Sequence, residues 1–167
     1  RFGCQVTGID LTGEFCEVAR RLNALTGFED RVVIEQGSAL AMPFDDATFD
    51  GAYSMNVSMN IEDKAGLYAE IFRVWRPGGW LTLSEIAAGP QPTIDYPTPW
   101  ASAPEYSFLS TPDQTRASLE AAGFVIDALA DAREAAARYG QRSREQEEAG
   151  GKPLHRAVHI VHCLLYT

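Results

Sequence analysis

The chain has 167 residues, of which 46% are hydrophobic and 22% are charged, and this balance predicts one soluble globular domain over residues 1–167. No apolar run is long enough for a transmembrane helix, so membrane insertion is not expected. Lys and Arg total 14 against 23 Asp and Glu, and the formal net charge of -9 argues against nucleic-acid binding, which needs a basic surface. A neutral or cationic small molecule is the expected partner.

The three cysteines, Cys4, Cys16 and Cys163, are odd in number and lack metal-binding spacing. They favour a reduced, cytoplasmic setting over a disulfide framework, and we interpret them as buried thiols. The chain starts without Met and reaches a strand within six residues. We therefore expect it to be a fragment of a longer protein.

Strand and helix patterns alternate along the N-terminal half of the chain. The predicted helices are residues 12–27, stopped by a glycine, and a helix ended by Pro77-Gly78-Gly79. The predicted strands are residues 5–9, 31–36, 52–57 and 80–86. Strands separated by helices indicate an α/β fold, with a doubly wound, mostly parallel sheet and helices on both faces.

The C-terminal half begins with a segment rich in proline and aromatic residues. This segment, residues 87–112, shows little periodicity, which predicts a loop or lid within the domain. A helix ending at residue 122, a strand at 124–129, a helix at 131–149 and a last strand at 157–166 are predicted to follow.

Polar side chains follow the predicted strands at the point where each strand ends. In an open parallel sheet the ligand binds beyond the carboxyl ends of the strands. Asp10 is in such a position, where a carboxylate can accept both hydroxyls of a ribose, although it could equally cap the next helix. The other positions are Ser38 with Ala39, residues 56–60, and Glu85.

Three stretches in this order resemble the class I S-adenosylmethionine-dependent methyltransferases. They are VTGID, QGSALAMPFDDATFDGAYSMN and YAEIFRVWRPGGWLTLSE, and the resemblance covers roughly residues 5–125. It is strongest to the small-molecule branch that includes enzymes of the ubiquinone/menaquinone-biosynthesis and sarcosine/dimethylglycine types. The family's fold is Rossmann-like and its cofactor is S-adenosylmethionine, so the resemblance implies methyl transfer to a small molecule, with an amine as one candidate.

The resemblance also implies positions for the cofactor. Asp10 would hold the ribose hydroxyls and Leu11 would pack on the adenine side. Ser38 and Ala39 would lie along the adenine edge. The methionine end would be lined by Asn56 and Val57.

Two departures from the family pattern lead to expectations of their own. The family commonly has Asp where Ser38 stands, so a hydroxyl would here meet the adenine amine. The family's first strand and glycine-rich loop should lie about 20 residues before Asp10, which the chain does not reach. That strand belongs between residues 5–9 and 52–57, so we expect a gap in the sheet with unpaired strand edges or one non-native pairing.

Methyl transfer from a sulfonium needs placement of the acceptor, loss of water and sometimes a base, but no protein nucleophile. Asn60 and Glu85 are therefore catalytic candidates, although Asn60 could cap a helix and Glu85 could be a capping or paired surface acid. Acceptor-binding candidates are Met59 and Asn60 together with aromatic residues of the 87–112 segment, because aromatic faces bind ammonium groups. These rings belong to Tyr96, Trp100, Tyr106 and Phe108, and ordinary loop packing is the alternative for each.

The histidines His155, His159 and His162 do not converge on one face of a strand, and in a helix only Cys163 would be a nearby partner, so no metal site is expected. Two other functions stay open: a non-catalytic methyltransferase-like scaffold or regulatory subunit, and a nicotinamide-dependent oxidoreductase. Open strand edges also make a homo-oligomer possible.

Overall fold

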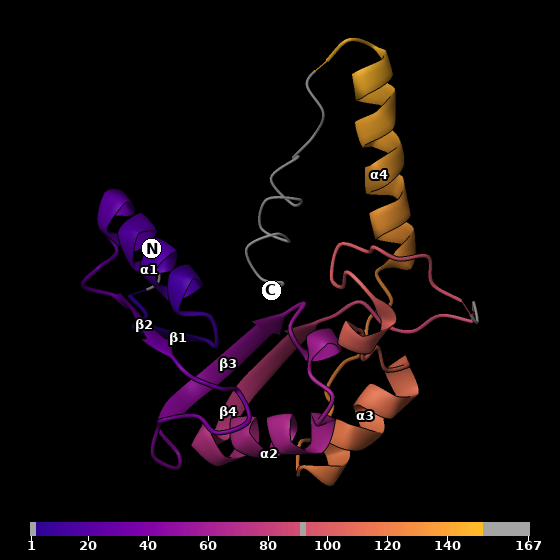
Figure 1. Cartoon of the computed structure of the whole chain (residues 1–167). Helices are drawn as coiled ribbons and strands as arrows, with labels where there is room; N and C mark the ends of the chain where they lie inside the picture. Colours follow the sequence, from indigo (N-terminus) through magenta and orange to yellow (C-terminus); the bar gives the residue numbers. More distant parts are fainter. Residues whose placement is uncertain (1–2, 91–92, 152–167) are drawn as a thin grey trace.

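The structure is a computed structural model that describes residues 3–90 and 93–151 (Figure 1). Strands and helices alternate in its first half, and helices follow in its second half. In chain order the elements are β1 (Val6–Asp10), α1 (Gly13–Thr26), β2 (Val32–Gln36), β3 (Phe49–Met55), the 3-10 turn η1 (Ser58–Asn60), α2 (Lys64–Val74), β4 (Trp75–Ser84), the 3-10 turn η2 (Pro104–Tyr106), α3 (Pro112–Ala121) and α4 (Arg133–Glu148).

The four strands form two parallel pairs. In the first pair β1 lies beside β2, in a register that runs from Val6 opposite Val32 to Asp10 opposite Gln36. In the second pair β3 lies beside β4, and Met55 is opposite Ser84 at their carboxyl ends. Within the described residues β1 and β3 do not pair, so the two pairs are separate sheets. The two sheets are thus separated between β1 and β3, the position at which the sequence predicts a gap.

Helix α1 packs across the first strand pair because its buried Cys16 lies against both strands. The Cys16 thiol is 3.6 Å from the carbonyl oxygens of Asp10 and Glu35. The helix ends at Gly27, whose φ of 71° is left-handed, a conformation that glycine adopts without steric cost. The interpretation of the cysteines as buried thiols holds for Cys16 and is wrong for Cys4, which is exposed, while Cys163 lies outside the described residues.

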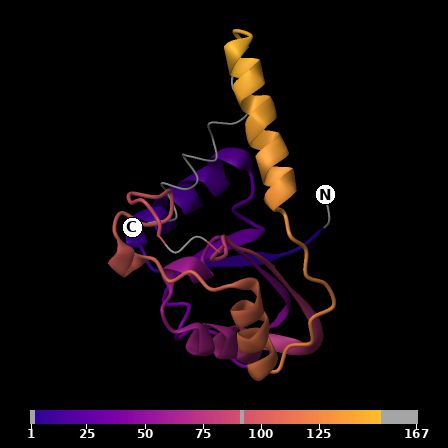
Figure 2. The ribbon, with the colours of Figure 1, turned by 90° about the vertical axis from the view of Figure 1, so that its right-hand side faces the viewer.

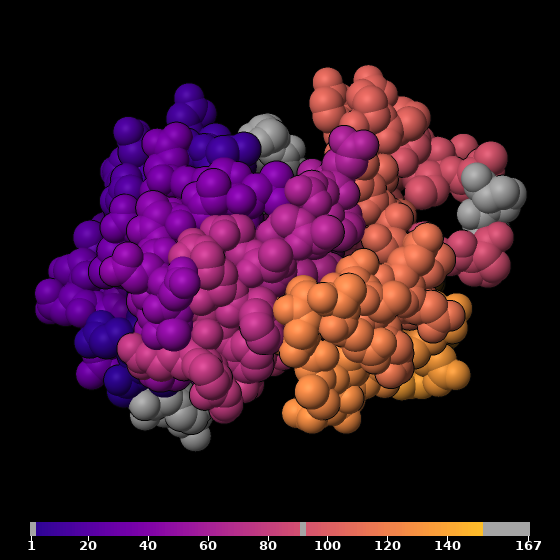
Figure 3. Space-filling model, turned by 90° about the horizontal axis from the view of Figure 1, so that it is seen from below, coloured from indigo at the N-terminus to yellow at the C-terminus, as the bar shows by residue number. Residues whose placement is uncertain are grey.

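The main core lies on one face of the second strand pair, where α2 and α3 pack together (Figure 1). Seen from below, the residues coloured for these two helices adjoin at the surface (Figure 3). Helix α1 lies on the other side of the strands in Figure 1, so helices occupy both sides, as predicted for a doubly wound fold. Apolar burial provides the stability of this core. Its buried members are Leu67, Tyr68, Ile71, Leu119 and Phe124, and partly buried Ala52, Leu81 and Leu83 contact them from the strands.

The opposite face of the β3–β4 pair is largely uncovered in the described part of the chain. Side chains alternate between the two faces of a strand, so Tyr53 and Met55 point away from the core, with exposures of 64% and 56%. Trp80 on β4 is 57% exposed on the same face and lies over Gly51, where an added Cβ would collide with the indole. This leaves a row of large apolar side chains without covering groups.

Two of the predicted elements after β3 differ from the structure. Helix α2 ends at Val74, and Pro77-Gly78-Gly79 lies inside β4, because Trp75 already pairs with Phe49. The strand predicted at 124–129 is wrong, since those residues take no regular structure. Instead Phe124 is buried against Trp75, with ring centroids 5.0 Å apart. The apolar residue that suggested a strand here is therefore a core residue in a loop. The strand predicted at 157–166 lies outside the described residues.

The predicted helix at 131–149 is confirmed as α4, which projects away from the strands in both ribbon views (Figures 1 and 2). None of its residues is buried. In the described part of the chain, no helix combines the length and the apolarity that spanning a membrane requires.

Candidate functional site

Asp10 lies at the carboxyl end of β1 and already has one structural task. Its Oδ1 accepts a hydrogen bond from the Thr12 backbone N–H at 2.7 Å, which helps to begin α1. Its backbone carbonyl accepts from Gly37 N–H at 2.9 Å, which joins the ends of β1 and β2. Asp10 is therefore not the cap of α1, whose N-cap residue is Thr12 without a side-chain cap bond; it fixes the turn that leads into the helix, and this uses one of its two carboxylate oxygens. The neighbouring Leu11 is 71% exposed.

Ser38 and Ala39 form a tight turn directly after β2. The Ser38 hydroxyl oxygen accepts from Leu40 N–H at 3.1 Å, and the Ser38 carbonyl accepts from Ala41 N–H at 3.1 Å. Ala39 packs against the core cluster. The turn is thus fixed to the body of the protein, and the Ser38 O–H proton remains able to donate.

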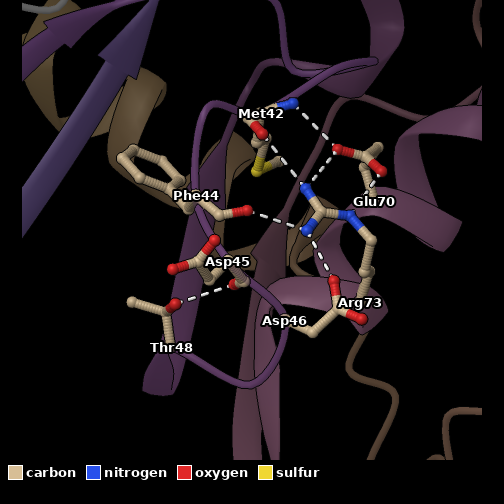
Figure 4. Close-up of polar contacts among 7 residues, drawn as sticks. All are labelled: Met42, Phe44, Asp45, Asp46, Thr48, Glu70 and Arg73. Atoms are coloured by element: carbon tan, nitrogen blue, oxygen red, sulfur yellow. Dashed lines mark hydrogen bonds and ion pairs between the residues drawn. The ribbon is translucent and has the colours of Figure 1, made fainter.

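The chain beyond this turn is tied to α2 by a polar cluster that we call the Arg73 clasp, made of Met42, Phe44, Asp46, Glu70 and Arg73 (Figure 4). The guanidinium donates to the carbonyls of Met42 and Phe44 at 3.0 and 2.8 Å and pairs with Asp46 and Glu70 at 2.8 Å. Glu70 also accepts from Met42 N–H at 2.8 Å. Hydrogen bonds from Arg73 lower the pKa of the Glu70 carboxyl and hold it ionised.

The clasp joins two of the stretches that carry the resemblance. LAMPFDDATFD supplies carbonyls and a carboxylate, and RVWRPGGWL supplies the guanidinium that binds them. Arginine suits this role because its planar fork presents several donors at once.

Asn56, just after β3, has a left-handed backbone with φ of 56°. Such a conformation is strained for a residue other than glycine, and this kind of strain gathers at functional sites. The Asn56 N–H donates to Ser84 O at 2.7 Å, while the N–H groups of Val57 and Ser58 donate to Glu85 Oε1 at 3.3 and 3.2 Å. The end of β4 thus shapes the turn that follows β3.

Glu85 and Asn60 each keep one buried oxygen without a hydrogen-bond partner. These oxygens are Glu85 Oε2 and Asn60 Oδ1, both of which are acceptors. A buried acceptor left unpaired costs about 1–3 kcal/mol. Two such atoms beside the same turn indicate a place where a donor from a ligand or water would be stabilised.

Asn60 and Met59 also contact the predicted lid segment, through bonds that involve its backbone. The Asn60 amide nitrogen donates to Trp100 O at 2.6 Å and faces Tyr106 O at 3.4 Å. The Met59 carbonyl accepts from Phe108 N–H at 2.8 Å, and the Met59 side chain is buried. The expected capping of a helix falls to Asp63, which accepts from Gly66 N–H at 2.8 Å.

Lys64 is a residue of this site that the sequence reasoning missed. Its ammonium group donates to the carbonyls of Ser58 at 2.6 Å, Phe108 at 2.8 Å and Ile61. Burial lowers the pKa of the Lys64 amine, and the nearby Glu85 carboxylate opposes that shift. No sequence signal could reveal these bonds, because all three acceptors are backbone atoms and one lies 44 residues away.

The aromatic candidates lie along the same segment. Trp100 is partly buried, and its indole N–H donates to Ser107 Oγ at 3.0 Å. Tyr96 is partly buried as well, whereas Tyr106 is 57% exposed. Their role in binding an acceptor stays a prediction.

No group of His, Cys, Asp and Glu side chains suited to a metal ion occurs among residues 3–90 and 93–151. His155, His159 and His162 lie outside those ranges.

Comparisons with known proteins show what the chain is similar to. Residues 1–83 match a family model described as "Methyltransferase domain". The chain is 31% identical to the O-methyltransferase cnsE of Penicillium expansum over 134 residues, which cover 80% of this chain and 48% of that protein. It is 35% identical to the demethylmenaquinone methyltransferase of Symbiobacterium thermophilum over 75 residues, which cover 45% of this chain and 30% of that protein.

A solved structure shows the same fold. It is phosphoethanolamine N-methyltransferase 2 of Haemonchus contortus in complex with S-adenosyl-L-methionine, with a TM-score of 0.71, 22% sequence identity, and coverage of 88% of this chain and 34% of that chain. The chain thus spans about half or less of the proteins it matches.

Proposed function

We propose that this chain, whose residues 1–83 belong to the methyltransferase domain family and whose fold is that of the class I S-adenosylmethionine-dependent enzymes, serves methyl transfer from that cofactor to a small molecule. The observation that carries the proposal is local. Asp10, Ser38 and Asn56 each stand at the carboxyl end of a parallel strand, which is where such sheets bind nucleotides.

The residues present are chemically suited to S-adenosylmethionine. The free oxygen of Asp10 fits a ribose hydroxyl, Leu11 offers an exposed apolar surface to adenine, and the Ser38 turn borders it. Asn56 and Val57 would hold the methionine end, where their turn is shaped by Glu85. When bound, the cofactor supplies an activated methyl group on sulfur.

The acceptor side lies beyond Asn56, among Met59, Asn60 and Glu85. The two unpartnered acceptor oxygens there favour a methyl acceptor that carries an N–H or O–H donor, such as an amine or a hydroxyl. Asn60 Oδ1 would orient that donor, and the Glu85 carboxylate would receive its proton. Trp100 and Tyr106 would add aromatic faces that suit an ammonium group, if the acceptor is an amine.

The proposal extends to the setting of the protein. Residues 1–167 would act as one domain, with residues 87–112 as its lid. Cys4 and Cys16 are reduced cysteines, which suits a reducing, cytoplasmic environment. The acidic composition speaks against nucleic acid as the substrate.

The test is calorimetric titration of S-adenosylmethionine into protein that contains residues 1–167, with the variants Asp10→Asn and Asp10→Ala. Asp10→Asn keeps an oxygen for Thr12 N–H but loses the charge. Losing a charge-assisted bond to ribose costs about 1.5–3 kcal/mol, so both variants should bind roughly ten- to hundredfold more weakly.

Equal affinity in wild type and both variants would remove Asp10 from the cofactor site. Absence of binding by the wild type would favour the scaffold alternative, and binding of a nicotinamide cofactor instead would favour the oxidoreductase. A panel of small acceptors with a labelled methyl group would then identify the substrate class.

A further inference from the structure

Two polar side chains outside the strands connect segments that are far apart in sequence. Asn60 and Lys64 lie just after β3, and their acceptors include carbonyls of residues 100, 106 and 108. Figure 1 shows the segment around η2 at the end of the molecule to which β3 and β4 point. The contacts therefore fix the aromatic segment near the carboxyl ends of these strands.

The Lys64 ammonium is well suited to fix two segments together. It has three N–H donors and three backbone carbonyl acceptors, two from residues 58–61 and one from Phe108. Hydrogen bonds to charged groups are roughly twice as strong as neutral ones. The backbone adds a further bond between the two segments, from Phe108 N–H to the Met59 carbonyl at 2.8 Å.

We propose that Lys64 and Asn60 are positioning residues that hold residues 98–108 as a fixed wall on the acceptor side of the site. The proposal rests on the proposed function, since that function defines the acceptor side as the region beyond Asn56. Neither residue needs to touch the methyl group. Their task is to place Trp100 and Tyr106 and to keep water away from the turn at 58–60.

The alternative is that these bonds only stabilise the whole domain. Two properties separate the possibilities. A positioning role predicts loosening confined to residues 98–108, with cofactor affinity preserved, because Asp10, Ser38 and Asn56 make none of these contacts. A general stabilising role predicts faster opening everywhere, including the β1–β2 pair.

The experiment is hydrogen–deuterium exchange, without cofactor, on protein that contains residues 1–167. The variant Lys64→Met keeps the apolar stem and removes all three donors, and Asn60→Ala tests the second contact separately. Arg138→Met is the matched control, because it removes an exposed cation that pairs with Glu134 one turn away on α4. Amides of Thr98 and Phe108, bonded to Ala101 O and Met59 O, report on the segment. Gly37 N–H, bonded to Asp10 O, reports on the strand ends.

We expect Lys64→Met to speed exchange at Thr98 and Phe108 about tenfold and to leave Gly37 unchanged, with a smaller effect in the same direction from Asn60→Ala. The control should change neither. Unchanged exchange in the segment, or an equal increase at Gly37, would overturn the proposal. If Lys64→Met does not fold, Asn60→Ala decides alone.

A second measurement separates this proposal from the proposed function. The dissociation constant of S-adenosylhomocysteine should stay within about twofold of wild type in both variants. A wild-type chain that does not bind this molecule contradicts the proposed function, while the exchange result still stands by itself. Binding that weakens as strongly as the segment loosens would contradict an acceptor-side role.

Discussion

Asn56 combines a strained backbone with a place beside the predicted cofactor site. An L-residue in the left-handed region pays a steric cost of about 1–2 kcal/mol that glycine avoids, although Asn tolerates it better than most. Hydrogen bonds to Ser84 and Glu85 hold the turn at Asn56 in this conformation. Strain that is held in this way is typical of functional sites.

The backbone strain at Asn56 can be measured with a pair of variants. Asn56→Ala and Asn56→Gly both delete the side chain, but only alanine keeps the steric cost of a positive φ. We expect the glycine variant to be the more stable by about 1 kcal/mol in urea unfolding. An alanine variant of equal or greater stability would show that the turn relaxes to a negative φ.

Glu70 makes the free energy of unfolding depend on pH in the acidic range. Its pKa is lowered in the folded state by Arg73, so the folded protein binds fewer protons than the unfolded chain. The stabilisation is fully present above the unfolded pKa of about 4.5 and is lost as pH falls through the lower folded value. We expect Glu70→Gln to lose stability near neutral pH and to show a flatter decline of unfolding free energy below pH 5. A decline as steep as that of wild type would contradict this assignment.

At the scale of elements, α3 has the most complete helix start in the described chain. The Thr111 hydroxyl accepts from Gln114 N–H at 3.2 Å, and the Gln114 side chain accepts from Thr111 N–H at 2.9 Å, which together form a capping box. The helix carries Leu119 into the core, so its start supports packing against α2.

Removing the cap should therefore lower the stability of the domain. We expect Thr111→Val to cost about 1 kcal/mol, measured by thermal or urea unfolding. Thr26→Val is a suitable control, because that hydroxyl bonds to Leu22 O within its own helix and caps no free N–H. Equal losses in the two variants would show that threonine chemistry, not capping, is responsible.

At the scale of the whole molecule, the residues that the structure describes form two parallel two-stranded sheets whose outer edges are open, and one apolar face of the β3–β4 pair is exposed. A two-stranded sheet is marginal by itself, and exposed edges recruit further strands. Tyr53, Met55 and Trp80 add a bare apolar patch to the same strands.

The 167-residue chain studied alone should therefore self-associate or unfold with low cooperativity. Sedimentation velocity across a range of concentrations should show a rising average mass. The double variant Tyr53→Lys and Met55→Lys should reduce it, because both substitutions add charge to the bare face without touching the core. A monomer that melts cooperatively at all concentrations would contradict the expectation, and with it the position of the gap.

Local sequence alone determined most of the elements and the order of the candidate cofactor residues. Apolar spacing, caps and glycine stops act within a few residues, so β1, α1, β2 and α3 were predicted within a residue or two. The positions of Asp10, Ser38 and Asn56 follow from those strand ends. Spacing could not reveal that Phe124 packs on Trp75 instead of extending a strand, because burial in a core and burial in a sheet give the same apolar pattern.

Only the tertiary structure decided which distant groups meet. The Arg73 clasp joins α2 to residues 42–46, and Lys64 joins the turn after β3 to Phe108. Many of these partners are backbone carbonyls, which every residue possesses, so no residue type signals them in advance. The left-handed turn at Asn56 likewise depends on Ser84 and Glu85 of another strand. The residue types at the strand ends can be predicted from the sequence, whereas their geometry is fixed by contacts between residues that are tens of positions apart.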